Sequence, residues 1–193
     1  MEERGVAMFP KPIVGRIPNF IGADKAAELL RTLPEYQKAK TIACNPDSPQ
    51  KPVREAALND GKKVVMATPR MRKGFILLDP ATIPKNHSSA AATIRGAFRY
   101  GHPADPSQVK VNLFIAGSVA VSLDGNRLGK GTGYSDQEYE ILKAKEAITA
   151  NTIVVTTVHD LQVVKSLPKE RWDVPVNVII TPTKVHRTAH SKP

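Results

Sequence analysis

KVNLFIAGSVAVSLDGNRLGKGTGYSDQEYEIL, residues 110–142, contains three successive segments that differ in amino-acid composition. Residues 110–123 are apolar and β-branched, which predicts a strand with a break at Gly117 and Ser118. Residues 135–148 have helical spacing, and Ser135 followed by Glu138 predicts an N-cap with a capping box. A glycine-rich loop lies between the two segments. The stretch therefore predicts a strand, a loop and a helix, the unit from which α/β folds are built.

The rest of the chain repeats this alternation. Helical spacing predicts helices over residues 23–33, 53–58 and 88–101. Apolar runs predict strands over residues 40–45, 62–69, 74–80 and 174–182, and a strand with its exit over residues 151–164. The strands are continuous apolar runs, which is typical of parallel strands covered on both faces. We therefore expect one three-layer α/β domain over residues 1–193 with a mostly parallel sheet, an extended or loop-like start over residues 1–20 and a frayed end over residues 183–193.

The charge of the chain favours an anionic partner. The sequence has 193 residues, a hydrophobic content of 41% and a formal net charge of +10. A charge of this size favours a nucleotide, a polyanionic cofactor or nucleic acid, although the same charges could only solvate the surface. The sequence has no RRM, KH or zinc signature, so nucleic-acid binding has no motif to support it.

The cellular compartment of the protein can be inferred from features that the sequence lacks. Cys44 is the only cysteine, which excludes an intrachain disulfide and a cysteine-based metal site and fits a reducing compartment. The start of the chain has no apolar run typical of a signal peptide, and no window is long and apolar enough to span a membrane. We therefore expect a cytoplasmic protein with no membrane partner.

The glycine-rich loop is a candidate phosphate site. Glycines let the backbone adopt positive φ and approach a ligand, and the N–H groups at the start of the following helix favour an anion. Arg127 and Lys130 would add positive charge. The spacing fits neither a Walker A loop nor the dinucleotide fingerprint, so a glycine-rich hairpin or connecting loop with surface cations stays open as the alternative. Asp136 would either hold Mg²⁺ through water or only complement the helix dipole.

A family resemblance extends this interpretation. GNRLGKGTGYSD, residues 125–136, resembles the G-x-R-L-G-x-G-x-G-Y-Y-D signature of the 5-formyltetrahydrofolate cyclo-ligase family. Residues 15–30, 44–58, 117–142, 156–164 and 173–182 resemble one branch of it, the cyclo-ligase-like proteins called methenyltetrahydrofolate synthetase domain-containing. The resemblance implies a Rossmann-like fold and the ATP- and Mg²⁺-dependent conversion of 5-formyltetrahydrofolate to 5,10-methenyltetrahydrofolate. In that reaction the formyl oxygen is phosphorylated, a ring nitrogen attacks and phosphate leaves.

The resemblance also implies roles for individual residues. Those expected to bind the ATP phosphates are Gly129, Lys130, Gly131, Thr132, Gly133 and Tyr134. Those expected to be catalytic are Arg127, Lys130 and Tyr134. The two cations among them would neutralise charge on a transferring phosphoryl group. Asp136 falls on the magnesium-associated carboxylate, and a reduced folate or similar acid would be the substrate.

Several positions depart from the family pattern. Val121 and Ser122 replace a Phe-Asp pair, and Ser135 replaces the second Tyr of the signature. The family enzymes open with a helix whose Lys and Arg reach the ATP phosphates, and here only Met1–Arg4 precedes the proline-rich segment, so that helix is either absent or reduced to its tail. These departures keep open a nucleotide- or anion-binding homologue without ligase activity.

Other residues are weaker candidates. Substitutes for the missing cations are Arg54, Lys62, Arg70 and Arg72, each of which could equally be a solvated surface charge. Aromatic residues that could contact a folate ring are Phe75, Phe98, Tyr100, Phe114 and Tyr134. His159 and Asp160 could line the site or form a structural pair, and Trp172 fits simple packing.

Overall fold

The computed structural model describes residues 1–170 and 173–191. The main sheet has eight strands in the order β13-β12-β10-β7-β3-β4-β5-β6. Their bounds are β3 Thr41–Cys44, β4 Lys63–Ala67, β5 Phe75–Leu78, β6 His102–Ala104, β7 Leu113–Ala116, β10 Ile153–Thr157, β12 Val178–Ile180 and β13 Val185–Arg187. The five central strands, from β12 to β4, are parallel, and the flanking strands are antiparallel. The prediction of a mostly parallel α/β sheet is confirmed.

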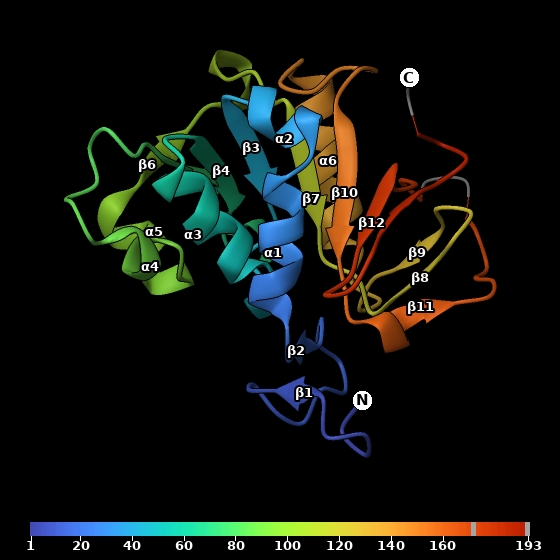
Figure 1. Ribbon diagram of the computed structural model, residues 1–193. Coiled ribbons are helices and arrows are strands. Elements are labelled where there is room, and N and C mark those ends of the chain that lie inside the picture. The colour runs from blue at the N-terminus through green and yellow to red at the C-terminus, as the bar shows by residue number, and fades with distance from the viewer. Residues whose placement is uncertain (171–172, 192–193) are drawn as a thin grey trace.

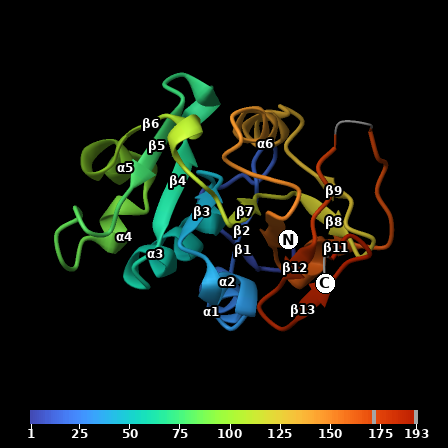
Figure 2. The same cartoon turned by 90° about the horizontal axis from the view of Figure 1, so that it is seen from above.

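Helices cover both faces of this sheet, as Figures 1 and 2 show. The main helices are α1 Ala23–Arg31, α2 Pro34–Lys38, α3 Lys51–Asn59, α4 Ser88–Ala91, α5 Ile94–Tyr100 and α6 Tyr134–Ala144. Successive side chains of a strand point to opposite faces. In β3, Ile42 and Cys44 pack in the core beneath α1 and α3, whereas Ala43 packs in the core beneath α6. Both faces of the sheet are therefore buried, which explains why the strands consist of continuous apolar runs.

The strand order creates a switch point at the centre of the sheet. From β3 the chain builds β4, β5 and β6 on one side, and from β7 it builds β10, β12 and β13 on the other. Strands β3 and β7 are parallel neighbours, with Ala43 opposite Phe114. Loops that leave the carboxyl ends of such a pair turn apart and leave a crevice, where open α/β sheets bind ligands.

Two smaller sheets flank the carboxyl end of the main sheet. One consists of β11 Val163–Val164, β8 Ala120–Ser122 and β9 Arg127–Leu128, and the other pairs β1 Ala7–Met8 with β2 Asn19–Phe20. The expected strand over residues 110–123 is therefore two strands in different sheets, divided at Gly117–Val119. The expected strand over residues 151–164 is β10, and its expected exit contains a 3-10 turn and the short strand β11.

Local structure corrects several other expectations. The expected helix over residues 88–101 is divided into α4 and α5, because Thr93 leaves the helical conformation and its Oγ1 caps α5 by accepting from Gly96 N at 2.9 Å. The expected frayed end contains β13, which is held by an ion pair of 2.7 Å between Arg187 Nη1 and Glu35 Oε1. The interpretation of Trp172 lies outside the described residues.

The remaining sequence expectations concern reactivity and membranes. Cys44 is buried in the core, and burial raises the pKa of its thiol to about 11, which leaves the thiol protonated and unreactive at neutral pH. Among the described residues, no helix is both long and apolar enough to cross a membrane.

Candidate functional site

A cavity of about 430 Å³ opens at the carboxyl ends of β3 and β7, at the switch point of the sheet. Its walls come from the N-terminal segment, the loops after β3, β4 and β7, and the loop and first turn of α6. The lining residues are Pro10, Gly15, Arg16, Ile17, Asn45, Pro46, Asp47, Ser48, Pro69, Arg70, Ile94, Gly117, Arg127, Gly129, Lys130, Thr132, Gly133, Tyr134, Ser135, Asp136 and Glu138. All of the residues expected to be catalytic, phosphate-binding or magnesium-associated, except Gly131, are in this lining.

The glycine-rich stretch has two structural parts. Gly125 lies in the hairpin between β8 and β9, where a Cβ would come within 2.7 Å of Val176 O, so this glycine serves backbone packing. After β9, the loop Gly129–Gly133 leads into α6, and Gly131 and Gly133 adopt φ of 84° and 66°. Gly133 is the N-cap of α6. The loop proper therefore begins only after Arg127 and Leu128 have formed a strand.

This loop presents unused hydrogen-bond donors. Within the described part of the chain, the backbone N–H groups of residues 130–136 donate no hydrogen bond. A Cβ built on Gly131 or Gly133 would meet no atom within 4 Å, so the space beside the loop is open. Free N–H groups at the start of an eleven-residue helix form an anion site, which the helix dipole strengthens. The donor set fits a phosphate group.

The two cations of the stretch are paired with carboxylates. Arg127 is almost fully buried, forms an ion pair with Asp136, and donates from Nη1 to Gly117 O at 3.2 Å. Its Nε is buried without a hydrogen-bond partner. Lys130 is partly exposed, and its Nζ lies 3.4 Å from Asp47 Oδ1. Lys130 can therefore turn toward a phosphate, whereas Arg127 is held in place between β7 and α6.

Asp136 is not arranged as a preformed metal ligand. One oxygen takes part in the ion pair with Arg127 and lies 3.5 Å from Val174 N. No group of three or more His, Cys, Asp or Glu side chains able to hold a metal ion occurs among the described residues. Magnesium here would therefore depend on phosphate oxygens and water for most of its ligands, which is usual for this ion.

Asn45 connects the loop after β3 to the loop after β7 and to α6. Its Oδ1 accepts from Gly117 N at 2.8 Å and from Ser135 Oγ at 2.9 Å, and its Nδ2 donates to Glu138 Oε2 at 2.5 Å. Because Gly117 N can only donate, the orientation of the Asn45 amide is fixed. This residue was not identified as a candidate from the sequence.

Glu138 is buried inside this network. The expected capping box is wrong, because Ser135 lies in the first turn of α6 and Glu138 points inward instead of back to the N-cap. Burial raises the pKa of Glu138 to about 8; nearby Asp47 adds to this rise, while the hydrogen bond from Asn45, Lys130 and Arg127 oppose it. The cavity floor thus contains a carboxyl group that is largely protonated at neutral pH.

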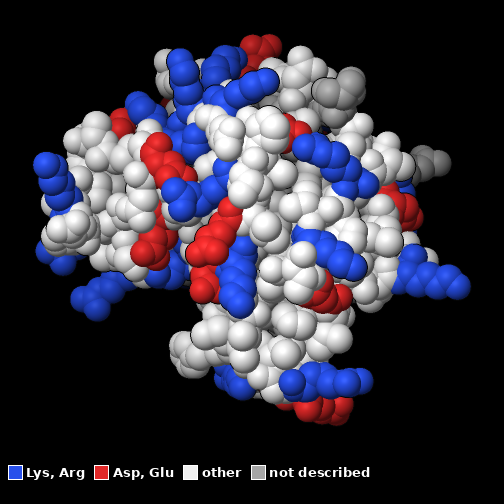
Figure 3. All heavy atoms as spheres, in the orientation of Figure 1, with Lys and Arg blue, Asp and Glu red and all other residues white. Residues whose placement is uncertain are grey.

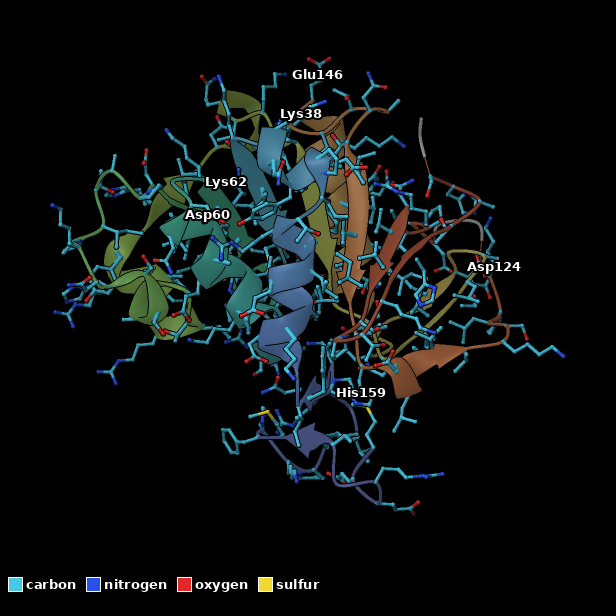
Figure 4. All side chains as sticks on the ribbon, viewed as in Figure 1. Lys38, Asp60, Lys62, Asp124, Glu146 and His159 are labelled. Atoms are coloured by element: carbon cyan, nitrogen blue, oxygen red, sulfur yellow. The ribbon has the colours of Figure 1, made fainter. Side chains whose placement is uncertain are left out.

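The four residues considered as replacements for the basic residues of the family's N-terminal helix lie in different parts of the structure. Arg54 is fully buried and donates to the carbonyls of Asn45, Pro46, Asp47 and Ala92, so its role is structural. Lys62 donates to Gln37 O and Ala39 O at the opposite end of the sheet (Figure 4). Arg70 lines the cavity, whereas Arg72 does not. Arg16, from the N-terminal segment, also lines the cavity, although its sequence context gives no signal for it.

The aromatic candidates mostly lie elsewhere. Phe75 and Phe114 are buried in the core, Tyr100 packs against His87, and Phe98 lies on α5 beneath Lys73. Only Tyr134, among the aromatic residues that the structure describes, lines the cavity. The remaining apolar lining comes from proline and isoleucine side chains, which could contact a folate ring but are not aromatic.

Two further groups of residues are not in the cavity lining. His159 accepts from Leu161 N at 3.1 Å, and Asp160 accepts from Thr181 and Thr183, so each has local partners (Figure 4 places His159 beside the N-terminal segment). Val121 and Ser122, which replace the Phe-Asp pair of the family pattern, are buried in β8. Neither Val121 nor Ser122 lines the cavity.

Charged side chains of both signs are present on the face of the molecule seen in Figure 3. On the face seen in Figure 3, lysine and arginine side chains are interspersed with acidic ones and gather most densely at the upper edge, near α2. That edge is the amino end of the sheet, away from the cavity.

Comparison with known proteins identifies the relatives of this chain. The profile of the 5-formyltetrahydrofolate cyclo-ligase family matches residues 1–182. The methenyltetrahydrofolate synthase domain-containing protein of Bos taurus is 42% identical over an alignment of 199 positions that covers 100% of this chain and 52% of that protein. The Homo sapiens protein of the same name is 38% identical with the same coverage. The chain thus spans about half the length of the curated relatives it matches.

Proteins named as cyclo-ligases or methenyltetrahydrofolate synthetases match this chain with lower sequence identity. The 5-formyltetrahydrofolate cyclo-ligase of Escherichia coli (strain K12) is 34% identical over 76 residues, or 39% of each chain. The solved 5,10-methenyltetrahydrofolate synthetase of Aquifex aeolicus has a TM-score of 0.58 and 24% identity, over 89% of this chain and 84% of that one. This structural likeness concerns the fold alone. The extent of the profile match decides the assignment: the chain belongs to the 5-formyltetrahydrofolate cyclo-ligase family.

Proposed function

We propose that the protein is an ATP- and Mg²⁺-dependent cyclo-ligase that converts 5-formyltetrahydrofolate to 5,10-methenyltetrahydrofolate. The observation that carries the proposal is the Gly129–Gly133 loop: the N–H groups of residues 130–133 donate no hydrogen bond in the described chain, and all of its residues except Gly131 line a cavity at the switch point of the sheet. Family membership supports the same reaction. ATP, when bound, would supply the phosphoryl group that activates the formyl oxygen.

The residues that line the cavity would have different roles in this reaction. Lys130 and the N–H groups of residues 130–136 would hold the phosphates and offset their negative charge. Tyr134, at the first position of α6, would contact the nucleotide or the substrate. Arg127 would keep α6 and the loop in register with β7, because its guanidinium joins Asp136 to Gly117 O. Asp136 would hold Mg²⁺ through water.

The direct test is turnover. Purified protein is mixed with ATP, Mg²⁺ and 5-formyltetrahydrofolate, and the absorbance of the methenyl product is followed. We expect Lys130→Ala to lower kcat/KM by about tenfold or more, because a charge-assisted hydrogen bond to phosphate contributes roughly 1.5–3 kcal/mol. Lys143→Ala is the matched control, since Lys143 is an exposed lysine of α6 that does not line the cavity. No product from the wild type would refute the proposal.

A second candidate is a nucleotide-binding homologue without ligase activity. It is favoured by the lining of the cavity, where Tyr134 is the one aromatic residue of the described chain available to a folate ring. This candidate gives a different result in the same experiment: ATP binds by calorimetry, Lys130→Ala weakens that binding, and no methenyl product forms.

A further inference from the structure

Four cationic side chains line the cavity, and they differ in their partners. Arg127 is paired with Asp136, and Lys130 lies near Asp47. Arg70 has no hydrogen bond or ion pair from its guanidinium within the described residues, and Arg16 donates only from Nε to Pro12 O at 3.2 Å. The cations without a carboxylate partner therefore lie outside the glycine-rich loop.

Arg16 is positioned by an ordered N-terminal segment. Ile17 and Phe20 are buried and anchor the end of the segment in the protein. Ile13 N donates to Glu2 Oε1 at 3.0 Å, and Asn19 Nδ2 donates to Phe9 O at 2.8 Å, which closes the segment on itself. Arg16, between these contacts, is exposed at the mouth of the cavity.

Arg70 is positioned by an unusual turn after β4. Arg70 and Met71 have φ of 55° and 56°, a conformation that is uncommon for residues other than glycine and unfavourable for each. Thr68 fixes the turn, because its Oγ1 accepts from Lys73 N at 2.9 Å and donates to Gly74 O at 3.0 Å. The turn places an unpaired guanidinium at the cavity, and unfavourable backbone conformations of this kind cluster at ligand sites.

We propose that Arg16 and Arg70 form a second oxyanion subsite of the cavity, which binds an acidic group that the Gly129–Gly133 loop does not hold. The guanidinium matches carboxylate and phosphate oxygens in a bidentate geometry. The group is therefore either a carboxylate of the folate substrate or the terminal phosphate of the nucleotide. The identity of the group rests on the proposed function, whereas the existence of the subsite does not.

The test uses two variants, each with a control of equal charge. Arg16→Gln is compared with Arg4→Gln, and Arg70→Gln with Arg72→Gln, because Arg4 and Arg72 are exposed and do not line the cavity. Inorganic phosphate, ATP and 5-formyltetrahydrofolate are titrated separately into the full chain by calorimetry. Circular dichroism and thermal melting show whether each variant is folded.

We expect inorganic phosphate to bind about fivefold or more weakly to Arg16→Gln and Arg70→Gln than to their controls, because each loses a charge-assisted contact. If the variants also bind 5-formyltetrahydrofolate more weakly but bind ATP as their controls do, the acidic group is a carboxylate of the folate. If they bind ATP more weakly but bind 5-formyltetrahydrofolate as their controls do, the group is a phosphate of the nucleotide. If both variants bind all three compounds as their controls do, or if the wild type binds none, the subsite does not exist. If the variants bind inorganic phosphate more weakly than their controls but the wild type forms no methenyl product, the subsite is supported and the proposed function is refuted.

Discussion

Replacing Glu138 by Gln tests the electrostatics of the cavity floor. The pKa of Glu138 is raised from an ordinary 4.5 to about 8, chiefly by burial. Between these values the folded protein holds the proton and the unfolded chain does not, so the stability associated with this group falls as pH rises from 4.5 to 8. Glutamine has no charge to bury, and its side-chain oxygen can still accept from Asn45 Nδ2. Glu138→Gln should therefore remove this part of the pH dependence.

The size of the effect follows from the shift. One pKa unit corresponds to about 1.4 kcal/mol, so the ionised form of Glu138 costs on the order of 3–5 kcal/mol in the folded state above pH 8. The charged groups around it are Asp47, which adds to the cost, and Lys130 and Arg127, which reduce it. We expect Glu138→Gln and the wild type to be about equally stable at pH 5, and the variant to be more stable by several kcal/mol at pH 9.

The assay is urea unfolding followed by circular dichroism at intervals from pH 5 to pH 9. Glu140→Gln is the matched control, because it removes the same charge from an exposed position on the same helix. The control should keep the pH slope of the wild type. Parallel pH profiles for Glu138→Gln and the wild type would show that Glu138 is ionised without penalty, and the reasoning about its burial would be wrong.

Substitutions at three further positions, with Gly129→Ala as a control, test the framework of the site, each by denaturant unfolding. Arg54→Ala should lower the free energy of unfolding by about 3–5 kcal/mol, because it leaves buried carbonyls without a donor; an effect below 1 kcal/mol would contradict this. Gly133→Ala should cost about 1–2 kcal/mol for a positive φ, whereas Gly129→Ala, where no positive φ is required, should be neutral within about 0.5 kcal/mol; equal effects would contradict the assignment. Asn45→Ala should cost about 2–4 kcal/mol, since it leaves the Gly117 N–H and Glu138 without a partner, and a neutral result would mean that water replaces the amide.

The sequence predicted the parts of the fold that depend on local pattern. Continuous apolar runs predicted parallel strands with two buried faces, and the central strands have them. The glycine-rich stretch predicted an open loop before a helix, and Gly131 and Gly133 have the required positive φ. In both cases, the spacing of residue types along a short segment contains the information.

The parts that could not be predicted depend on contacts between distant segments. Ser135 and Glu138 have the spacing of a capping box, but Asn45, ninety positions earlier for one of them, draws both side chains inward. Residues 183–193 look like a polar tail, but pairing with β12 and the ion pair of Arg187 with Glu35 make part of them a strand. Arg16 reaches the cavity only because the N-terminal segment folds back against the carboxyl end of the sheet.

The position of Arg54 determines which walls of the cavity can move. Its guanidinium ties the carbonyls of residues 45–47 to Ala92 O, just before the helix that provides Ile94, so these two walls form one rigid block. By contrast, the hydrogen bonds of residues 10–16 in the described chain remain within the N-terminal segment. Narrowing of the cavity around a ligand is therefore expected from the segment with Arg16 and from the Gly129–Gly133 loop, and not from this block. In amide hydrogen exchange, residues 10–16 and 130–136 should gain the most protection on ligand binding, and the block around Arg54 should change least.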